Sequence, residues 1–196
     1  MHNTRGSVSR QTLYIAIISA LIAGFIGGVV YSAFRSASPH PAQQQTETHT
    51  HDNATAQASI QALEQKAQED PDNAQVWANL GHAFFDKGQA DDAIAAYTRS
   101  LAIEPGNNDV RTDLGVMYFQ SEKHREAVTE FDKVLNADPK HPQARFNKGV
   151  VLYSGLGNKA GALAEWNILL QANPEAMTPT GMPLKELIRQ VEAEKQ

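Results

Sequence analysis

The sequence predicts an all-α protein built from a stack of repeated helical pairs. Three glycines and three prolines recur at intervals of 34 or 35 residues, at Gly81, Gly115, Gly149, Pro105, Pro139 and Pro174. A large aromatic residue follows each glycine at a nearly constant distance, at Tyr97, Phe131 and Trp166. A fixed period in the thirties is typical of solenoid arrays, in which each unit buries its apolar face only against its neighbours.

The units share more than these residues. Aligned on the glycines they read Trp77, Leu80, Gly81, Phe84, Ala93, Tyr97, Pro105; then Arg111, Leu114, Gly115, Tyr118, Ala127, Phe131, Pro139; then Arg145, Lys148, Gly149, Leu152, Ala162, Trp166, Pro174. This pattern resembles the tetratricopeptide repeat (TPR), a helix–turn–helix unit of 34 residues, over residues 74–175. The resemblance implies three units at 74–107, 108–141 and 142–176. In each unit the glycine is expected to let helix A approach helix B, and the aromatic residue to fill the space between successive helices.

The third unit departs from the pattern. Lys148 replaces a core leucine, and the turn over residues 154–159 carries one extra residue before Ala162. Its two helices are expected to pair as in the other units, with a more mobile turn between them.

One helix is expected on each side of the repeats. Ile60, Leu63 and Ala67 share a face in residues 56–71, which end in a proline that stops a helix. Residues 183–196 carry apolar residues at i, i+3, i+4 and i+7, as an amphipathic capping helix requires: Leu184, Leu187, Ile188 and Val191. The array is therefore predicted to contain eight helices.

The N-terminal part predicts a membrane anchor. Residues 13–34 are uncharged and mostly apolar, and as a helix they would be about 33 Å long, enough to cross a bilayer. The alternative, a cleaved signal peptide, has a shorter apolar core and needs a cleavage site that does not follow here. Arg5 and Arg10 precede the span and only Arg35 follows closely, so residues 1–12 are expected in the cytoplasm and the repeats across the membrane. Residues 35–55 are expected to form a flexible polar linker.

Small residues form a stripe along the predicted span. They recur every four residues, at Ala16, Ala20, Gly24, Gly28 and Ser32. Such a stripe lets two membrane helices touch, which makes a homodimer possible; the alternative is that glycine and alanine are simply common in membrane helices.

No arrangement of residues predicts catalysis, and the chain is expected not to be an enzyme and to need no cofactor. It has no cysteine, no phosphate-binding glycine loop and no serine elbow. Glu47, His49, His51 and Asp52 are of metal-ligand type, but a flexible linker fixes no coordination geometry, so no metal site is assigned. From residue 53 onward the formal charge is −6, which argues against nucleic acid as a ligand.

The remaining candidate site is the concave groove. In TPR proteins the second, fifth, ninth and twelfth residues of each repeat line this surface, and Asp113 is added here as an expected exposed neighbour of Asp109. The resulting set is Gln75, Ala78, His82, Phe85, Asp109, Thr112, Asp113, Val116, Phe119, Gln143, Phe146, Val150 and Tyr153. The column of Phe85, Phe119 and Tyr153 is open to two interpretations, groove lining or core packing. His82, His124 and His141 are expected on the surface.

The groove composition indicates the kind of ligand. Certain TPR domains hold a peptide C-terminal carboxylate with a lysine, asparagine and arginine clamp, and the matching positions here do not carry it. Apolar and acidic residues remain, which favours a protein or peptide with apolar anchors and a basic side chain.

These features together predict a single-pass, membrane-anchored TPR adaptor. The anchor, polar linker and three repeats are also similar to the TPR accessory subunits of bacterial cytochrome c biogenesis, which implies a periplasmic array on the bacterial inner membrane that binds apocytochrome or haem-lyase components. A homo-oligomeric structural membrane protein is a further alternative.

Overall fold

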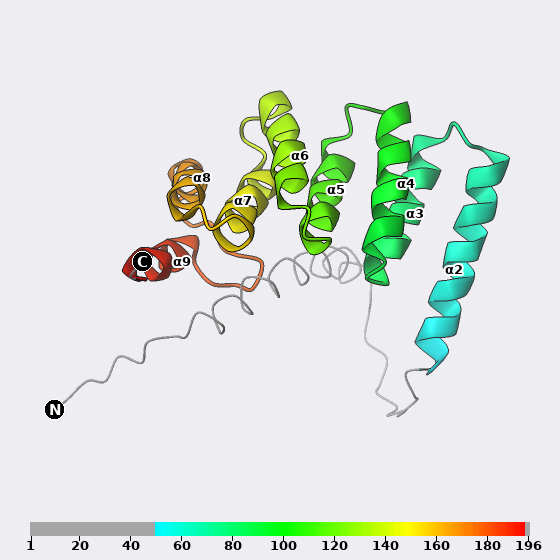
Figure 1. Cartoon of the computed structure of the whole chain (residues 1–196), viewed down its shortest axis with the longest axis horizontal. Coiled ribbons are helices and arrows are strands. Elements are labelled where there is room, and N and C mark those ends of the chain that lie inside the picture. The colour runs from blue at the N-terminus through cyan, green and yellow to red at the C-terminus, as the bar shows by residue number, and fades with distance from the viewer. Residues whose placement is uncertain (1–49, 195–196) are drawn as a thin grey trace, which may run out of the picture.

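The computed structural model describes residues 50–194, and this part of the chain is mainly helical (Figure 1). It contains eight α-helices and one π-helical turn. In chain order these are α2 (Thr50–Glu69), α3 (Ala74–Asp86), α4 (Ala90–Ile103), α5 (Asn108–Gln120), α6 (His124–Ala137), α7 (Pro142–Val150), η1 (Val151–Gly155), α8 (Lys159–Ala172) and α9 (Leu184–Ala193).

The helices form a TPR solenoid. The pairs α3–α4, α5–α6 and α7–α8 are the three predicted repeats, and each helix packs against the next along the chain. α2 packs on α3 and α9 packs on α8, so both flanking helices extend the stack. The predicted all-α fold is therefore confirmed. The predicted N-terminus 1–12, membrane span 13–34 and most of the linker 35–55 lie outside the described residues.

The N-terminal flanking helix begins earlier in the chain than its predicted bound. α2 begins at Thr50 rather than at residue 56, inside the segment predicted as linker. Residues 50–55 contain neither glycine nor proline and include alanine, so they extend the helix although they have no large apolar side chain. α9 begins at Leu184, directly after Pro183, and buries Leu184, Leu187, Ile188 and Val191, the four apolar residues of the predicted stripe.

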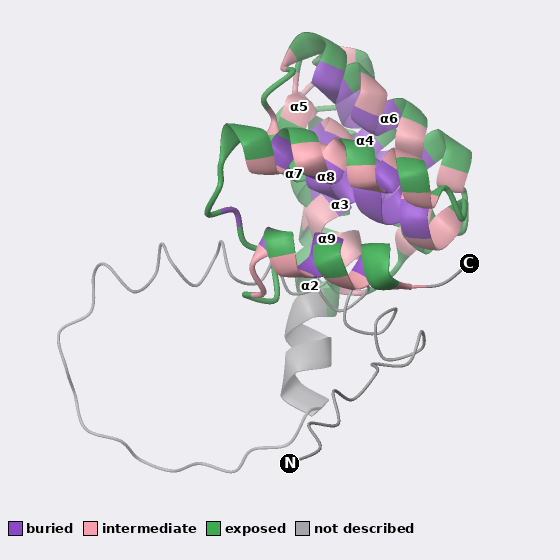
Figure 2. Cartoon of the chain, turned by 90° about the vertical axis from the view of Figure 1, so that its left-hand side faces the viewer, coloured by how far each residue is buried: buried purple, intermediate pink, exposed green. Residues whose placement is uncertain are grey.

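The repeating glycines are explained by the aromatic rings opposite them. A Cβ built on Gly115 would lie 2.7 Å from the ring of Phe131, closer than real Cβ contacts come. Gly81 and Gly149 are similarly covered by Tyr97 and Trp166. All three rings are fully buried. Figure 2 marks the buried stretches of the helices in purple, alternating with exposed stretches in green. Glycine is therefore required so that a whole aromatic side chain fits against helix A.

The extra residue of the third repeat forms a π-helical turn. The backbone N–H of Leu156 donates to the carbonyl of Val151 at 3.0 Å, which widens the end of α7 by one residue. Gly157 follows with a φ of +63°. The register is restored at Ala162, which is fully buried as Ala93 and Ala127 are.

The first residue of the repeat pattern makes the same contact in all three units although its identity changes. Trp77 Nε1 donates to the carbonyl of Pro71 at 2.9 Å. Arg111 and Arg145 donate to the carbonyls of Pro105 and Pro139, each at 2.7 Å. A side-chain N–H donor at this position therefore ties each helix A to the turn that precedes it.

Lys148 is stabilised at its core position by charge. Its ammonium lies 2.6 Å from Glu165 and 2.7 Å from Asp132. Glu165 also accepts from Arg145 at 2.5 Å, so two cations share one carboxylate. Burial of the ammonium opposes its charged form, but the hydrogen bonds to Asp132 and Glu165 outweigh that effect and raise the pKa of Lys148.

Candidate partner-binding face

The candidate site is the surface formed by the first helices of the repeats, α3, α5 and α7, which we call the A-helix face. Each of these helices begins at a side-chain cap, and the three caps occupy equivalent positions of the repeat: Asn73, Asn107 and His141. The Oδ1 atoms of Asn73 and Asn107 accept from the backbone N–H groups of Gln75 and Val110, both at 3.1 Å. In the third repeat the Nδ1 atom of His141 takes this role and accepts from Ala144 N–H at 3.2 Å. These caps fix the residue at which each helix begins, and so they set the positions of the site residues along it.

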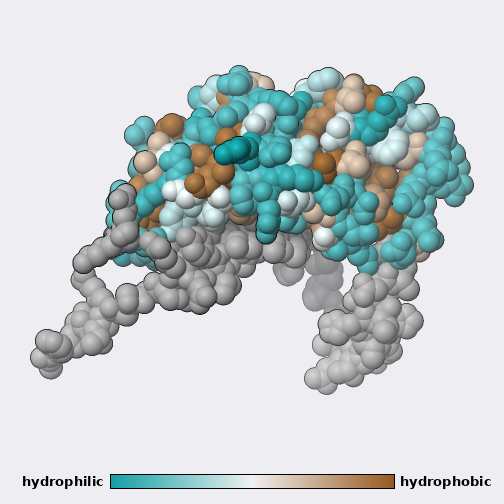
Figure 3. All heavy atoms as spheres, viewed as in Figure 1, coloured by the Kyte–Doolittle hydropathy of each residue, from teal (hydrophilic) through white to brown (hydrophobic). Residues whose placement is uncertain are grey.

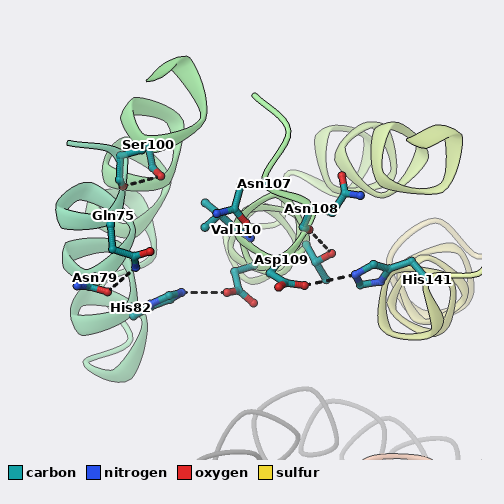
Figure 4. Close-up of polar contacts among 12 residues, drawn as sticks. Gln75, Asn79, His82, Ser100, Asn107, Asn108, Asp109, Val110 and His141 are labelled. Atoms are coloured by element: carbon teal, nitrogen blue, oxygen red, sulfur yellow. Dashed lines mark hydrogen bonds and ion pairs between the residues drawn. The ribbon is translucent and has the colours of Figure 1, made fainter. Parts of the chain in front are cut away.

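Two histidine–carboxylate contacts cross the repeat junctions on this face (Figure 4). His82 of α3 lies 3.2 Å from Asp113 of α5, measured between Nε2 and Oδ2. Asp109 of α5 lies 3.5 Å from His141 at the start of α7, measured between Oδ1 and Nε2. The histidines are partly buried, contrary to the expectation that they lie on the surface; His124 is partly buried as well. Together the contacts link the first helices of all three repeats.

The predicted groove residues fall into three groups by exposure. Gln75, Asp109 and Gln143, one from each repeat, are exposed. His82, Phe85 and Phe119 are partly buried. The others are buried: Ala78, Thr112, Asp113, Val116, Phe146, Val150 and Tyr153.

Burial changes the interpretation of several of these residues. Ala78, Val116, Phe146 and Val150 belong to the main hydrophobic core, and the hydroxyl of Thr112 donates to the carbonyl of Asn108 within its own helix. They shape the A-helix face from beneath and do not offer side chains at its surface. The expectation that Asp113 is exposed is wrong, because its carboxylate faces His82 on the neighbouring helix.

The aromatic column combines both interpretations that the sequence left open. Phe85 and Phe119 pack against the core while staying partly exposed. Tyr153 is buried; its ring lies 6.0 Å from that of Trp166, and its hydroxyl donates to Glu194, at the end of α9, at 2.5 Å. The C-terminal helix therefore holds the third member of the column, and the two phenylalanines remain as candidate apolar contacts.

A buried polar group lies beneath the first junction. Tyr97 is fully buried, and its hydroxyl has no hydrogen-bond partner in the described part of the chain. Burial, together with the charges of Asp113 and Asp86, raises the pKa of Tyr97, so it stays neutral at any physiological pH. Burial also raises the pKa of Asp86, and the nearby His82 acts in the opposite direction.

Other predicted sites fall wholly or partly outside the described residues. The small-residue stripe Ala20, Gly24, Gly28 and Ser32 lies there, and so do the side chains of the histidine-rich segment 47–52. Within residues 50–194 no helix is both long and apolar enough to cross a membrane. The same residues contain no group of three or more histidine or carboxylate side chains placed to hold a metal ion.

Comparison with protein families decides the relationship of the chain. Residues 37–178 match the model of the cytochrome c-type biogenesis protein H TPR domain, which is more than half of the sequence. The chain belongs to this family. No curated protein matches the chain.

Solved structures similar to this TPR protein show the same fold. A crystal structure of MamA is 15% identical with a TM-score of 0.61, over 77% of this chain and 95% of MamA. The first TPR of Spaghetti (RPAP3), bound to the HSP90 peptide SRMEEVD, is 22% identical with a TM-score of 0.54, over 61% of this chain and 91% of that one. A further MamA structure, from AMB-1, is 32% identical with a TM-score of 0.54, over 63% and 73% of the two chains. These TPR neighbours include one with a bound peptide, and the fold is that of a protein-interaction scaffold.

Proposed function

We propose that this TPR protein acts in cytochrome c maturation as a non-enzymatic adaptor that binds a protein partner on its A-helix face. The match to the cytochrome c-type biogenesis protein H TPR domain is the observation that carries this proposal. Apocytochrome or a haem-lyase component is the proposed partner, and residues 13–34 would anchor the chain in the bacterial inner membrane with the repeats in the periplasm.

Exposure on the A-helix face supports a polypeptide ligand. Gln75, Asp109 and Gln143 offer exposed hydrogen-bonding groups at the same position of three successive repeats. Phe85 and Phe119 each offer a partly exposed apolar side chain. On the side of the molecule drawn in Figure 3, apolar areas are separate and surrounded by hydrophilic residues.

The exposed acidic group favours a basic side chain in the partner. The side chain of Asp109 is 93% exposed although it also contacts His141, whereas that of Asp113 is 13% exposed and faces His82. Asp109 alone is therefore the proposed contact for a ligand cation. An exposed ion pair is worth up to about 1 kcal/mol, so its loss would weaken binding roughly fivefold at low salt.

The proposal is tested by reversing the charge of Asp109. Asp109→Lys should leave the fold intact and reduce the affinity of the full-length protein for apocytochrome c at low salt, and the difference should shrink at high salt. Glu126→Lys is the matched control, because Glu126 is also an exposed acidic residue in the first turn of a helix, but on α6. Equal affinities for wild type and Asp109→Lys at low salt would move the site away from this face.

Crosslinking distinguishes an adaptor from a self-associating structural protein. Crosslinking in native membranes should join the protein to haem-lyase components or apocytochrome. Crosslinks between copies of this chain alone would favour the homo-oligomeric structural protein predicted as the second alternative.

A further inference from the structure

The three caps that begin α3, α5 and α7 are chemically unequal. Asn73 and Asn107 are 34 residues apart, and 34 residues further the equivalent position holds His141. An asparagine amide oxygen accepts hydrogen bonds at any physiological pH. An imidazole nitrogen accepts only while it carries no proton, and histidine is the side chain whose charge ordinarily changes between pH 5 and 8.

The His141 ring makes one contact at each of its two nitrogens. Its Nδ1 accepts from the backbone N–H of Ala144 at 3.2 Å, so this nitrogen carries no proton in the structure. Its Nε2 is 3.5 Å from the Asp109 carboxylate, which places the single ring proton of the neutral form on the side of Asp109. One neutral tautomer therefore satisfies both neighbours.

We propose that His141 is a proton-sensitive cap that loosens the start of α7 on acidification. A second proton must enter at Nδ1, where it meets the N–H of Ala144, and two donors then face each other. The hydrogen bond is lost, and the cation also lies at the positive end of the helix.

The other charged groups around His141 do not replace this cap. Asp109 on α5 contacts the ring at Nε2, the far side from Ala144. In the turn between α6 and α7, the carboxylate of Asp138 accepts from the backbone of Lys140. On α7, the guanidinium of Arg145 is engaged by Glu165 and by the carbonyl of Pro139. Among residues 50–194, the side-chain acceptor found for the Ala144 N–H is the imidazole nitrogen of His141.

The loosened turn carries part of the candidate site. Gln143 lies exposed in the first turn of α7, and Asp109 is the residue that His141 contacts. Reduced partner binding at acidic pH would follow if the A-helix face binds a partner, and this consequence alone rests on the proposed function. The cap itself is tested without any ligand.

The test is amide hydrogen exchange of the full-length protein at pH 8 and pH 5.5, comparing wild type with His141→Asn, which installs the cap of the other two repeats. Because both proteins are compared at the same pH, the intrinsic pH dependence of exchange cancels. At pH 8 the amides of residues 143–147 should exchange at equal rates. At pH 5.5 the wild type should exchange roughly fivefold faster there, the change expected when one helix cap is lost.

The equivalent amides of α3, residues 75–79, serve as the internal control, since Asn73 caps that helix in both proteins. They should show no difference at either pH. Equal exchange of residues 143–147 in the two proteins at pH 5.5 would overturn the inference, as would a difference of the same size in α3. The exchange test needs no partner, so its failure would leave the proposed function standing, and a failure to bind a partner would leave the cap standing.

Discussion

The contact between the two helices of a repeat includes one site that is apolar in the first repeat and charged in the third. This difference permits a direct test of how much the charged group contributes to the free energy of unfolding. The equivalent residues are Trp77, Leu80 and Ala96 in the first repeat, and Arg145, Lys148 and Glu165 in the third. In the first repeat Leu80 and Ala96 are buried in one apolar cluster, and Trp77 packs against that cluster. In the third repeat the carboxylate of Glu165 takes the place of Ala96 and binds two cations.

Glu165→Ala should destabilise the protein by about 2–3 kcal/mol. Removing one member of a buried ion pair costs about 3–5 kcal/mol when the remaining charge is left unpaired. The side chains of Arg145, Lys148 and Glu165 are 13–17% exposed, so the site is largely shielded from water. After the substitution, Arg145 keeps its hydrogen bond to the carbonyl of Pro139 and Lys148 keeps its contact with Asp132. The expected cost therefore lies below that of leaving a buried charge unpaired.

Copying the first repeat into the third should remove most of this cost. The triple variant Arg145→Trp, Lys148→Leu, Glu165→Ala replaces the buried charges with the apolar set that the chain already uses elsewhere. Such replacements are often neutral or stabilising. We expect it to unfold within about 1 kcal/mol of wild type.

The assay is equilibrium unfolding in urea of the full-length protein at pH 7, with midpoint and slope fitted for all three proteins. A loss below about 0.5 kcal/mol for Glu165→Ala would show that the ionic network adds little, as many ion pairs do. A triple variant as unstable as the single one would refute the equivalence of the two packing solutions.

Further substitutions test the repeat packing. Trp166→Ala should lower the unfolding free energy by about 3–5 kcal/mol, because it empties a fully buried site. Gly115→Leu should be comparably damaging, because a side chain there meets the ring of Phe131. For either variant, a melting temperature within about two degrees of wild type would contradict this packing. Glu122 has a φ of 59° at a turn position where the other repeats have glycine, so Glu122→Gly should raise the unfolding free energy by about 0.5–1 kcal/mol, and a loss would show that the turn is not strained. The pKa of Lys148 is raised in the folded state, so its contribution to stability is complete below its unfolded pKa and is lost as the pH rises through the folded pKa. Wild type should therefore lose more unfolding free energy above about pH 10 than Lys148→Leu does. Parallel pH profiles of the two proteins in urea unfolding would contradict this.

The sequence was sufficient to predict the repeats because the residues that define them act within one unit. Gly115 and Phe131 belong to the same helical pair, and their spacing alone indicates that they meet. The extra residue of the third turn was also visible in the sequence, but not that it forms a π-helical turn at Val151–Gly155.

Contacts between units were harder to predict. Periodicity identifies equivalent positions, but the rotation from one pair to the next decides which side chains face each other across a junction. The contact between His82 and Asp113 depends on that rotation, and so does the burial of Val150 at a position predicted to line the groove. The cap formed by His141 was missed although its 34-residue spacing from Asn107 is present in the sequence, because histidine is an uncommon cap residue.

Site-specific photocrosslinking in cells tests the central proposal most directly, because it reports the partner and the face that binds it. A photoreactive residue at Gln75 or Gln143 lies on the A-helix face, and one at Ala95 or Ile168 lies exposed on a second helix of a repeat. Crosslinks from the first pair to apocytochrome or a haem-lyase component, with none from the second pair, are the expected result. Crosslinks only from the second pair, or only to other copies of this chain, would contradict an adaptor that binds its partner on the A-helix face.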